Sequence, residues 1–248
     1  MHRDIVIHSG GVDSTTVLHQ LLLDAPKNHR VVSLSIVYGS RSAREAEVAR
    51  SICAELNRVG LRVDHWVVDL RIRLNQDQRP RARALELMSD EYRFAPSTYP
   101  HRNTLFVLSA LSVLESCAVS LGDTFDLYLG IHKVKEGEEA VYPDTTPEWL
   151  KLVNDLSQMC SVLNCPPKII APFVDAYKED IIVRAYEMCT PLHLTRTCYR
   201  LDEVWPKPAC NMCNGCVSRR RCFERASLPD PIDNPELWRK RFEEKHRG

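Results

Sequence analysis

A glycine-containing turn between a short apolar strand and an amphipathic helix, close to the N-terminus, limits the possible folds more than any other stretch of the chain. The segment Asp4–His8 predicts a buried strand, and Ser14–Leu23 carries apolar residues at a helical period. The turn that joins them reads Ser9-Gly10-Gly11-Val12-Asp13-Ser14. A strand followed so closely by a helix predicts the first unit of a parallel α/β sheet.

Strands and helices are predicted to alternate along the chain up to about residue 190. The further strands are expected at 31–37, 63–69, 126–130 and 168–172, and the helices at 42–57, 103–119, 146–163 and 178–188. This alternation favours right-handed βαβ units, and so a Rossmann-like parallel sheet with helices on both faces, as in adenine nucleotide alpha hydrolases. The polar, Arg-rich stretch 71–100 is expected to contain a helix and to pass over the site.

Charge and hydropathy exclude some classes of partner. The 33 Lys and Arg residues balance 33 Asp and Glu residues, so bulk charge gives no reason to expect nucleic acid or an anionic membrane. No apolar run is expected to span a bilayer, and the N-terminus lacks a signal-peptide pattern, so we expect a cytoplasmic protein. Beyond residue 190 the chain becomes rich in Cys, Pro and Arg. We therefore expect an α/β domain over 1–190 and, over 191–248, a small metal-binding region with a terminal helix at 235–246.

The glycine turn is expected to bind phosphate. Ligands of open parallel sheets bind at the carboxyl ends of the strands, and the following helix offers free N–H groups there. Gly10 and Gly11 let the backbone approach an oxyanion, Ser9 and Ser14 add hydroxyl groups, and Asp13 is a candidate ligand for Mg²⁺. The turn fits neither a Walker loop nor a dinucleotide fingerprint. It resembles the PP-loop of N-type ATP pyrophosphatases, which split ATP between the α- and β-phosphates and transfer AMP to an oxygen of the substrate.

A second motif lies near the C-terminus, where Cys198, Cys210, Cys213 and Cys216 form C-x11-C-x2-C-x2-C. Four thiolates suit tetrahedral zinc in a closed, structural site. An iron–sulfur cluster and a redox dithiol are the alternatives. Cys222 is expected to begin a helix beyond this site. The remaining cysteines are expected to be small buried apolar residues: Cys53, Cys117, Cys160, Cys165 and Cys189.

Taken in order, the motifs resemble the 7-cyano-7-deazaguanine synthase family of the queuosine pathway, from about Asp4 to Cys222. The matching segments are Ser9–Thr16, Tyr38 to Arg41 with Glu45–Arg50, Pro100–Asn103, Tyr142–Asp144, Pro172 with Lys178, and the cysteine motif. The resemblance implies an ATP-dependent carbon–nitrogen ligase of EC class 6. ATP would adenylate 7-carboxy-7-deazaguanine, ammonia would displace AMP to give an amide, and a second ATP would convert this amide to the nitrile.

The resemblance also implies roles for particular residues. The residues expected to bind ATP are Ser9, Gly10, Gly11, Asp13, Ser14, Thr15, Tyr38 and Arg41. Those expected to act at the reacting centre are Asp13, Ser14, Arg102 and Lys178. Those expected to contact the deazapurine are Asn103, Gly130, Tyr142 and Asp144. ATP, Mg²⁺ and a structural Zn²⁺ are the implied cofactors, and a homodimer is the implied assembly.

Other functions stay open because the loop at 131–141 and the gap between Cys198 and Cys210 depart from the family pattern. A diverged member would adenylate another carboxylate or amide, or attach a deazapurine to nucleic acid or protein in phage or anti-phage modification. A tRNA-modifying thiolase is a related alternative, against which the zero net charge counts. A zinc-ribbon binding or regulatory protein with a relic nucleotide site is the alternative from another class.

Overall fold

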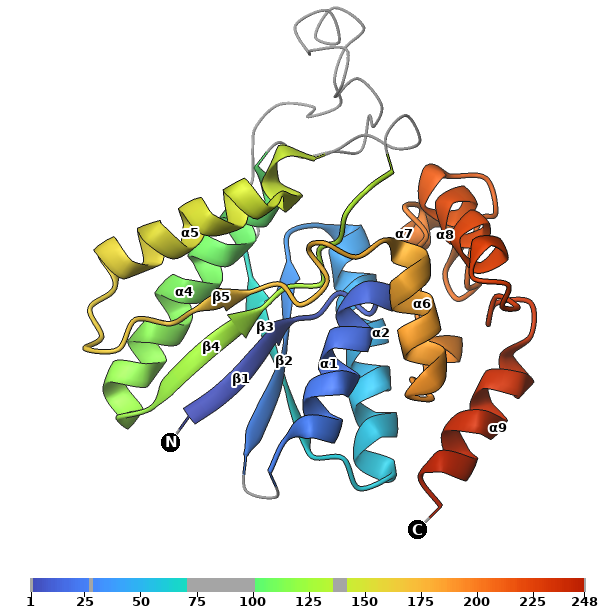
Figure 1. The fold of residues 1–248 in the computed structure, drawn as a ribbon, viewed down its shortest axis with the longest axis horizontal. Helices are drawn as coiled ribbons and strands as arrows, with labels where there is room; N and C mark the ends of the chain where they lie inside the picture. Colours follow the sequence, from blue (N-terminus) through green and yellow to red (C-terminus); the bar gives the residue numbers. More distant parts are fainter. Residues whose placement is uncertain (1, 27–28, 71–100, 136–141, 248) are drawn as a thin grey trace, which may run out of the picture.

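The computed structural model describes residues 2–26, 29–70, 101–135 and 142–247, and these form a parallel sheet covered by helices on both faces (Figure 1). The sheet has five strands in the order β3-β2-β1-β4-β5. Their bounds are β1 His2–Ile7, β2 Arg30–Val37, β3 Val63–Asp69, β4 Thr124–Tyr128 and β5 Ile169–Ile170. The predicted fold class is confirmed. The stretch 71–100 lies outside the described residues.

Helices α1, α2 and α6 cover one face of the sheet, and α4 and α5 cover the other (Figure 1). The α-helices of the described part are α1 Val12–Asp24, α2 Ser40–Arg58, α4 Arg102–Leu121, α5 Pro147–Cys160, α6 Lys178–Glu187, α7 Leu201–Val204, α8 Asn214–Arg225 and α9 Pro235–Lys245. Short 3₁₀ turns lie at η2 Pro143–Thr145 and η3 Leu192–Leu194. Strand β5 is shorter than predicted because Pro167 and Pro172 flank it and have no N–H group to donate.

The central strand is buried on both faces, which explains its apolar sequence. On β1, Ile5 packs into the layer under α4, whereas Val6 packs into the layer under α1 and α2. Parallel pairing aligns Ile5 with Val32 of β2 and with Leu127 of β4. The sheet therefore holds the end of β1, and the turn after it, in the middle of the molecule.

Helix α4 is the one helix of the described part that is long and apolar enough to cross a membrane. The window Arg102–Ser120 has a mean hydropathy of 1.4 and is 28% buried inside the molecule. This corrects the expectation that no apolar run approaches such a length. Val107, Ala110 and Leu114 of the helix nevertheless pack in the core against the sheet, and a core helix meets the same criterion of length and composition.

The segment after residue 190 shares its core with the sheet-covering helices. Cys198, Leu201 and Phe242 belong to the same buried cluster as Val17 and Ile52 of α1 and α2. In Figure 1, α8 and α9 lie along the outer side of α6. The predicted boundary at residue 190 stays a prediction, since the two parts of the chain are packed together.

Candidate active site

A pocket opens at the carboxyl ends of the strands, where the strand order reverses between β1 and β4. It gathers most of the residues that the sequence predicted for the site, from six separate segments. The predicted residues that line it are Ser9, Gly11, Asp13, Ser14, Tyr38, Arg41, Arg102, Asn103, Gly130, Tyr142 and Lys178. The phosphate turn, the segment after β2, the start of α4 and the start of α6 thus meet around one cavity.

The glycine turn enters α1 as the sequence predicted, and each glycine has a steric reason. Gly10 has φ +72°, and a Cβ there would lie 2.6 Å from Val48 Cγ1 of α2. A Cβ on Gly130, after β4, would lie 2.6 Å from the backbone nitrogen of Ser14. The Ser14 hydroxyl accepts a hydrogen bond from the Ser9 N–H at 3.4 Å. The turn is therefore packed closely between two neighbouring segments and keeps its first helical turn facing the pocket.

Asp13 and Lys178 form an ion pair inside the pocket, with Lys178 Nζ 2.9 Å from Asp13 Oδ2. Burial disfavours the Asp13 carboxylate, but the charges of Lys178 and then His132 outweigh it and keep its pKa below the ordinary value. The other oxygen, Oδ1, is buried and has no hydrogen-bond partner among the described residues. An ionised carboxylate with one free oxygen beside a phosphate-binding turn is a suitable ligand for Mg²⁺.

Three predicted residues do not face the pocket. Thr15 is fully buried, and its hydroxyl lies 3.0 Å from His8 Nε2, so its side chain belongs to the core behind the turn. Gly10 uses its carbonyl to accept the Arg196 N–H at 3.0 Å. Asp144 accepts the Asn103 N–H at 2.7 Å through its side chain and so satisfies the start of α4. These contacts give the three residues structural tasks, and their predicted ligand contacts stay predictions.

The far side of the pocket combines aromatic rings with a charged pair. The rings of Tyr38 and Phe106 lie 5.1 Å apart. Arg41 donates to the Tyr38 hydroxyl at 3.0 Å and pairs with Glu45 at 3.3 Å, and its guanidinium lies 5.6 Å from the ring of Tyr199. Burial raises the pKa of Glu45, an effect that Arg41 and Arg102 only partly offset. This side offers flat stacking surfaces and hydrogen-bonding groups of both kinds, which suit a heterocyclic base.

The sequence did not single out several pocket residues. They are Phe106, His132, Arg196 and Ser218, together with Glu45, Thr197 and Tyr199, which it had placed in motifs without a role. Thr197 and Tyr199 flank Cys198, so the cysteine motif was the signal that could have located them. His132 lies in the loop at 131–141, whose second half, 136–141, lies outside the described residues.

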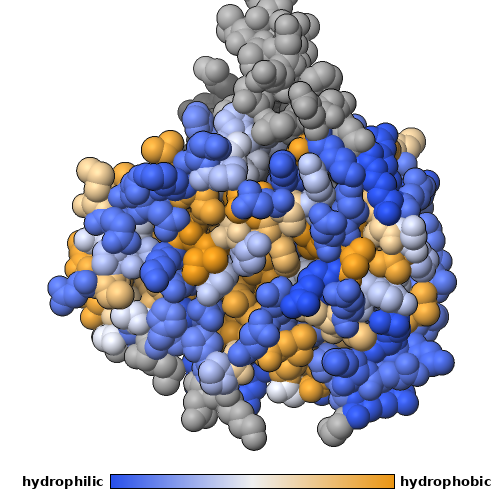
Figure 2. All heavy atoms as spheres, viewed as in Figure 1, coloured by the Kyte–Doolittle hydropathy of each residue, from blue (hydrophilic) through white to orange (hydrophobic). Residues whose placement is uncertain are grey.

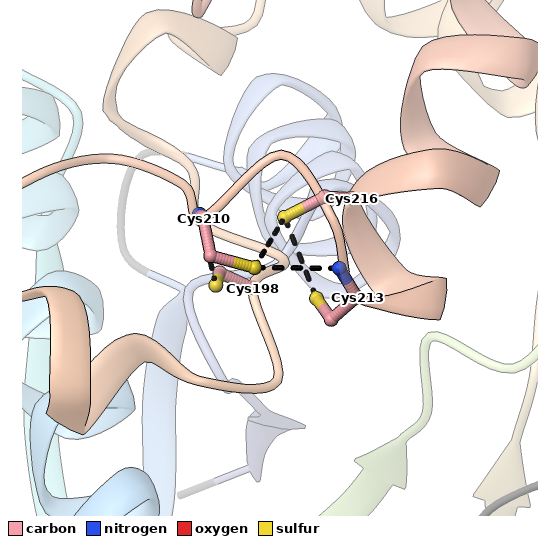
Figure 3. A group of neighbouring side chains, drawn as sticks. All are labelled: Cys198, Cys210, Cys213 and Cys216. Carbon is pink, nitrogen blue, oxygen red and sulfur yellow. Dashed lines mark hydrogen bonds between the residues drawn. The ribbon is translucent and has the colours of Figure 1, made fainter.

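The four predicted cysteines converge on one point (Figure 3). Cys216 Sγ lies 3.5 Å from Cys213 Sγ and 3.9 Å from Cys210 Sγ. Four thiolates around zinc, with Zn–S bonds of about 2.3 Å, would be separated by about 3.8 Å. Burial acts against the Cys210 thiolate, but N–H groups of Met212 and Cys213 and the neighbouring thiols outweigh it and lower its pKa to about 6. The donor set fits a tetrahedral metal ion.

The surroundings of this cluster correct two expectations. Helix α8 already begins at Asn214, so Asn214 and Gly215 are its first residues, and Cys222 lies well inside it. Cys117, Cys160 and Cys165 are exposed, whereas only Cys53 of the five scattered cysteines is buried. Cys117 and Cys160 lie on α4 and α5, two helices whose core-facing sides the sequence analysis did not assign.

The fold and the turn place this chain in the class of parallel α/β proteins with a PP-loop-like turn after the first strand. Residues 3–227 match the family model of the queuosine biosynthesis protein QueC, and the chain belongs to that family. This confirms the resemblance found in the sequence, and membership makes the protein a synthase of queuosine-type deazapurine chemistry.

Curated relatives agree over nearly their whole length. The chain is 32% identical over 240 residues to the 7-cyano-7-deazaguanine synthase of Synechococcus elongatus, covering 93% of this chain and 94% of that protein. It is 33% identical over 238 residues to the enzyme of Myxococcus xanthus, covering 92% and 96%. Among solved structures, the U34-tRNA thiolase NcsA from Methanococcus maripaludis with its [4Fe-4S] cluster matches with a TM-score of 0.45 and 14% identity, over 100% of this chain and 73% of that one.

Proposed function

We propose that this protein converts 7-carboxy-7-deazaguanine and ammonia to 7-cyano-7-deazaguanine in the cytoplasm, through adenylated intermediates, with release of AMP and pyrophosphate. Two of the curated relatives bear the name of this product's synthase. The observation that carries the ATP half of the proposal is the Asp13–Lys178 pair beside the phosphate turn, within the pocket. The reaction class is that of a carbon–nitrogen ligase.

The chemistry is a problem of leaving groups. A carboxylate repels ammonia, whereas an acyl adenylate carries AMP as a good leaving group. The turn at Ser9 to Ser14 would hold the triphosphate on the N-terminus of α1, and Lys178 would stabilise the negative charge that develops on the phosphates. The aromatic side of the pocket would orient the deazapurine so that its carboxylate meets the α-phosphate in line.

Two metal ions belong to the proposal. Mg²⁺ would be held by Asp13 Oδ1, the buried oxygen without a partner, and when bound it would neutralise phosphate charge. A structural Zn²⁺ would be held by the four cysteines, whose sulfur spacing suits it.

A homodimer is also proposed. The family resemblance supports it, as do apolar side chains that reach the surface where α4 and α5 lie (Figure 2). On this face Met159 is 83% exposed and Leu152 is 66% exposed. A group of exposed large apolar side chains is unusual on the surface of a monomer. A mass of one chain in sedimentation equilibrium would contradict the dimer.

The test of the reaction is the release of AMP and pyrophosphate from ATP with and without 7-carboxy-7-deazaguanine and ammonium. We expect acceptor-dependent AMP, two per nitrile formed, and the loss of at least ~100-fold in rate in Asp13→Asn, since a charge-bearing group beside the transferring phosphate is removed. Asp24→Asn, at the far end of α1, is the matched control. Nitrile formation at the normal rate by Asp13→Asn would contradict the phosphate assignment.

The same assay separates the alternatives. AMP formed only when tRNA or protein is added would favour a conjugating variant or a thiolase. No AMP with any acceptor would favour a binding protein with a relic site.

A further inference from the structure

Arg219 is a buried cation that belongs neither to the lining of the pocket nor to the cysteine cluster. Its side chain is 1% exposed, although it belongs to the run Arg219–Arg221, in which both neighbours are exposed. Its Nε donates to both carboxylate oxygens of Asp230 at 3.0 Å, and Asp230 is itself buried. Burying a charge is costly even when it is paired, so a buried arginine on an otherwise solvated helix requires a reason.

The same guanidinium holds the segment Thr195–Tyr199, called the strap below. Arg219 Nη1 donates to the Thr195 hydroxyl at 3.0 Å and to the Thr197 hydroxyl at 3.1 Å. Between these two threonines lies Arg196, whose N–H donates to the carbonyl of Gly10 at 3.0 Å. The strap is thereby attached on one side to α8 and on the other side to the phosphate turn.

Close packing fixes the strap on its α8 side as well. A Cβ on Gly215 of α8 would lie only 2.4 Å from the carbonyl oxygen of Thr197. Cys198 belongs to the strap, and Cys216 precedes Arg219 by about one helical turn, so the cysteine cluster joins the same two elements. The strap, α8 and the cluster therefore form one unit against the phosphate turn.

This unit brings the positive charge of Arg196 to the pocket, where its guanidinium donates to the backbone carbonyls of His193 at 3.2 Å and Thr195 at 3.0 Å. Arg196 lines the pocket, and no ion pair joins it to a carboxylate of the described residues. Arg219 Nη2 is buried and has no hydrogen-bond partner in the part of the chain that the structure describes. An anionic ligand is the group that would balance this arrangement.

We propose that Arg196 and Thr197 form a second wall of the phosphate site, which takes the β- and γ-phosphates of the nucleotide, and that Arg219 is the positioning residue that sets this wall. The inference rests on the proposed function as far as ATP is the ligand. The inference goes beyond the proposed function because the strap, opposite the glycine turn, is assigned the part of the site that binds the β- and γ-phosphates.

The experiment measures the affinities of ATP, inorganic pyrophosphate and AMP by calorimetric titration of the metal-loaded protein. The decisive variant is Thr195→Val, because Thr195 is fully buried and outside the pocket lining, and valine keeps its shape. Arg219→Lys, which keeps the charge and loses the planar fork, is the second variant. Arg220→Met, an exposed arginine on the same helix, is the matched control.

We expect both variants to bind pyrophosphate and ATP about tenfold more weakly, the size of one lost hydrogen bond to a charged group. AMP has no β- or γ-phosphate, so its affinity should not change, and the control should bind all three ligands normally. Metal content and the unfolding midpoint of Thr195→Val are measured in parallel. Where Arg219→Lys fails to fold, Thr195→Val decides.

Two results would overturn the proposal. One is unchanged pyrophosphate affinity in Thr195→Val. The other is an equal loss for AMP and pyrophosphate together with a lower unfolding midpoint, which would show that Arg219 only stabilises the fold. A third result would separate the two proposals: pyrophosphate binding depends on Thr195 as expected, but the wild-type protein forms no AMP with any acceptor. This result would refute the proposed reaction and would still support the second wall of the phosphate site.

Discussion

Gly130 lies just after β4, directly beside the first turn of α1. A Cβ at this position would lie 2.6 Å from Ser14 N and 2.7 Å from Ser14 Cα, which are backbone atoms that cannot move aside separately. The sequence placed Gly130 at the deazapurine. That role stays a prediction, and the structure adds a steric one, because the missing Cβ lets the segment after β4 approach the glycine turn.

Gly130→Ala should therefore displace the turn and weaken ATP binding by about 5- to 150-fold, because overpacking of this kind costs about 1–3 kcal/mol. Titration with ATP measures the change. Gly39→Ala is the contrast, since a Cβ there meets no atom within 4 Å and the backbone is extended. Equal ATP affinity in wild type and Gly130→Ala would mean that the close approach is not needed for nucleotide binding.

At single positions, the sequence predicted which motif residues meet but not which way each side chain points. Ser14 faces the pocket and Thr15, one residue later, faces the core, because successive helix positions differ by about 100° and the motif does not reveal the orientation of the helix. The burial of Arg219 could not be foreseen either. Its partner Asp230 lies eleven residues later and beyond the end of α8, and runs of arginine are usually solvated.

Helix α8 shows how far the cysteine motif predicts the secondary structure around it. The spacing of the cysteines predicted their convergence, since two residues between cysteines allow both sulfurs to reach one ion. The spacing did not predict that the helix starts within the motif, with Cys213 as the residue before its first turn. Strand β5 and helix α5 were predicted in the right places but too long. Residue propensities alone do not mark where a strand or a helix ends.

Removing one sulfur should therefore disturb a whole helix. We expect Cys213→Ser to lose the metal ion, because a neutral hydroxyl replaces a thiolate ligand. The strap should loosen with it and ATP affinity should fall. Metal analysis is the measurement, with an expected change from one zinc per chain to near zero, and Cys165→Ser, an exposed cysteine away from the cluster, is the control. Iron with acid-labile sulfide in the wild type would instead identify an iron–sulfur cluster.

The whole molecule keeps histidines neutral in its interior. Burial, followed by the charge of a neighbouring histidine, lowers the pKa of His8 and of His19 to about 3 in each case. Burial likewise lowers the pKa of His193 to about 4. The unfolded chain takes up protons at its histidines below about pH 6.5, whereas the folded protein does not. Their contribution to stability is therefore complete above pH 6.5 and decreases as the pH falls.

We expect the free energy of unfolding to decrease by about 2 kcal/mol for each of His8 and His19 between pH 8 and pH 5, from the difference between folded and unfolded pKa values. The raised pKa of Glu45 acts in the opposite direction and offsets part of this. Denaturant titrations at the two pH values measure the change. His19→Gln should show a smaller decrease than wild type, and His101→Asn, at an exposed position, should match wild type. Equal stability at both pH values would contradict the prediction.

The last helix of the chain lies beyond the stretch that matches the QueC family model, which stops at residue 227. Trp238 and Phe242 of α9 are nevertheless almost fully enclosed, and Trp238 belongs to the same buried cluster as Val12 at the start of α1. A fragment trimmed to the homologous portion would thus open a hole under the phosphate turn. Expression boundaries should therefore keep α9, because Trp238 and Phe242 belong to the core of the protein although they follow the matched stretch.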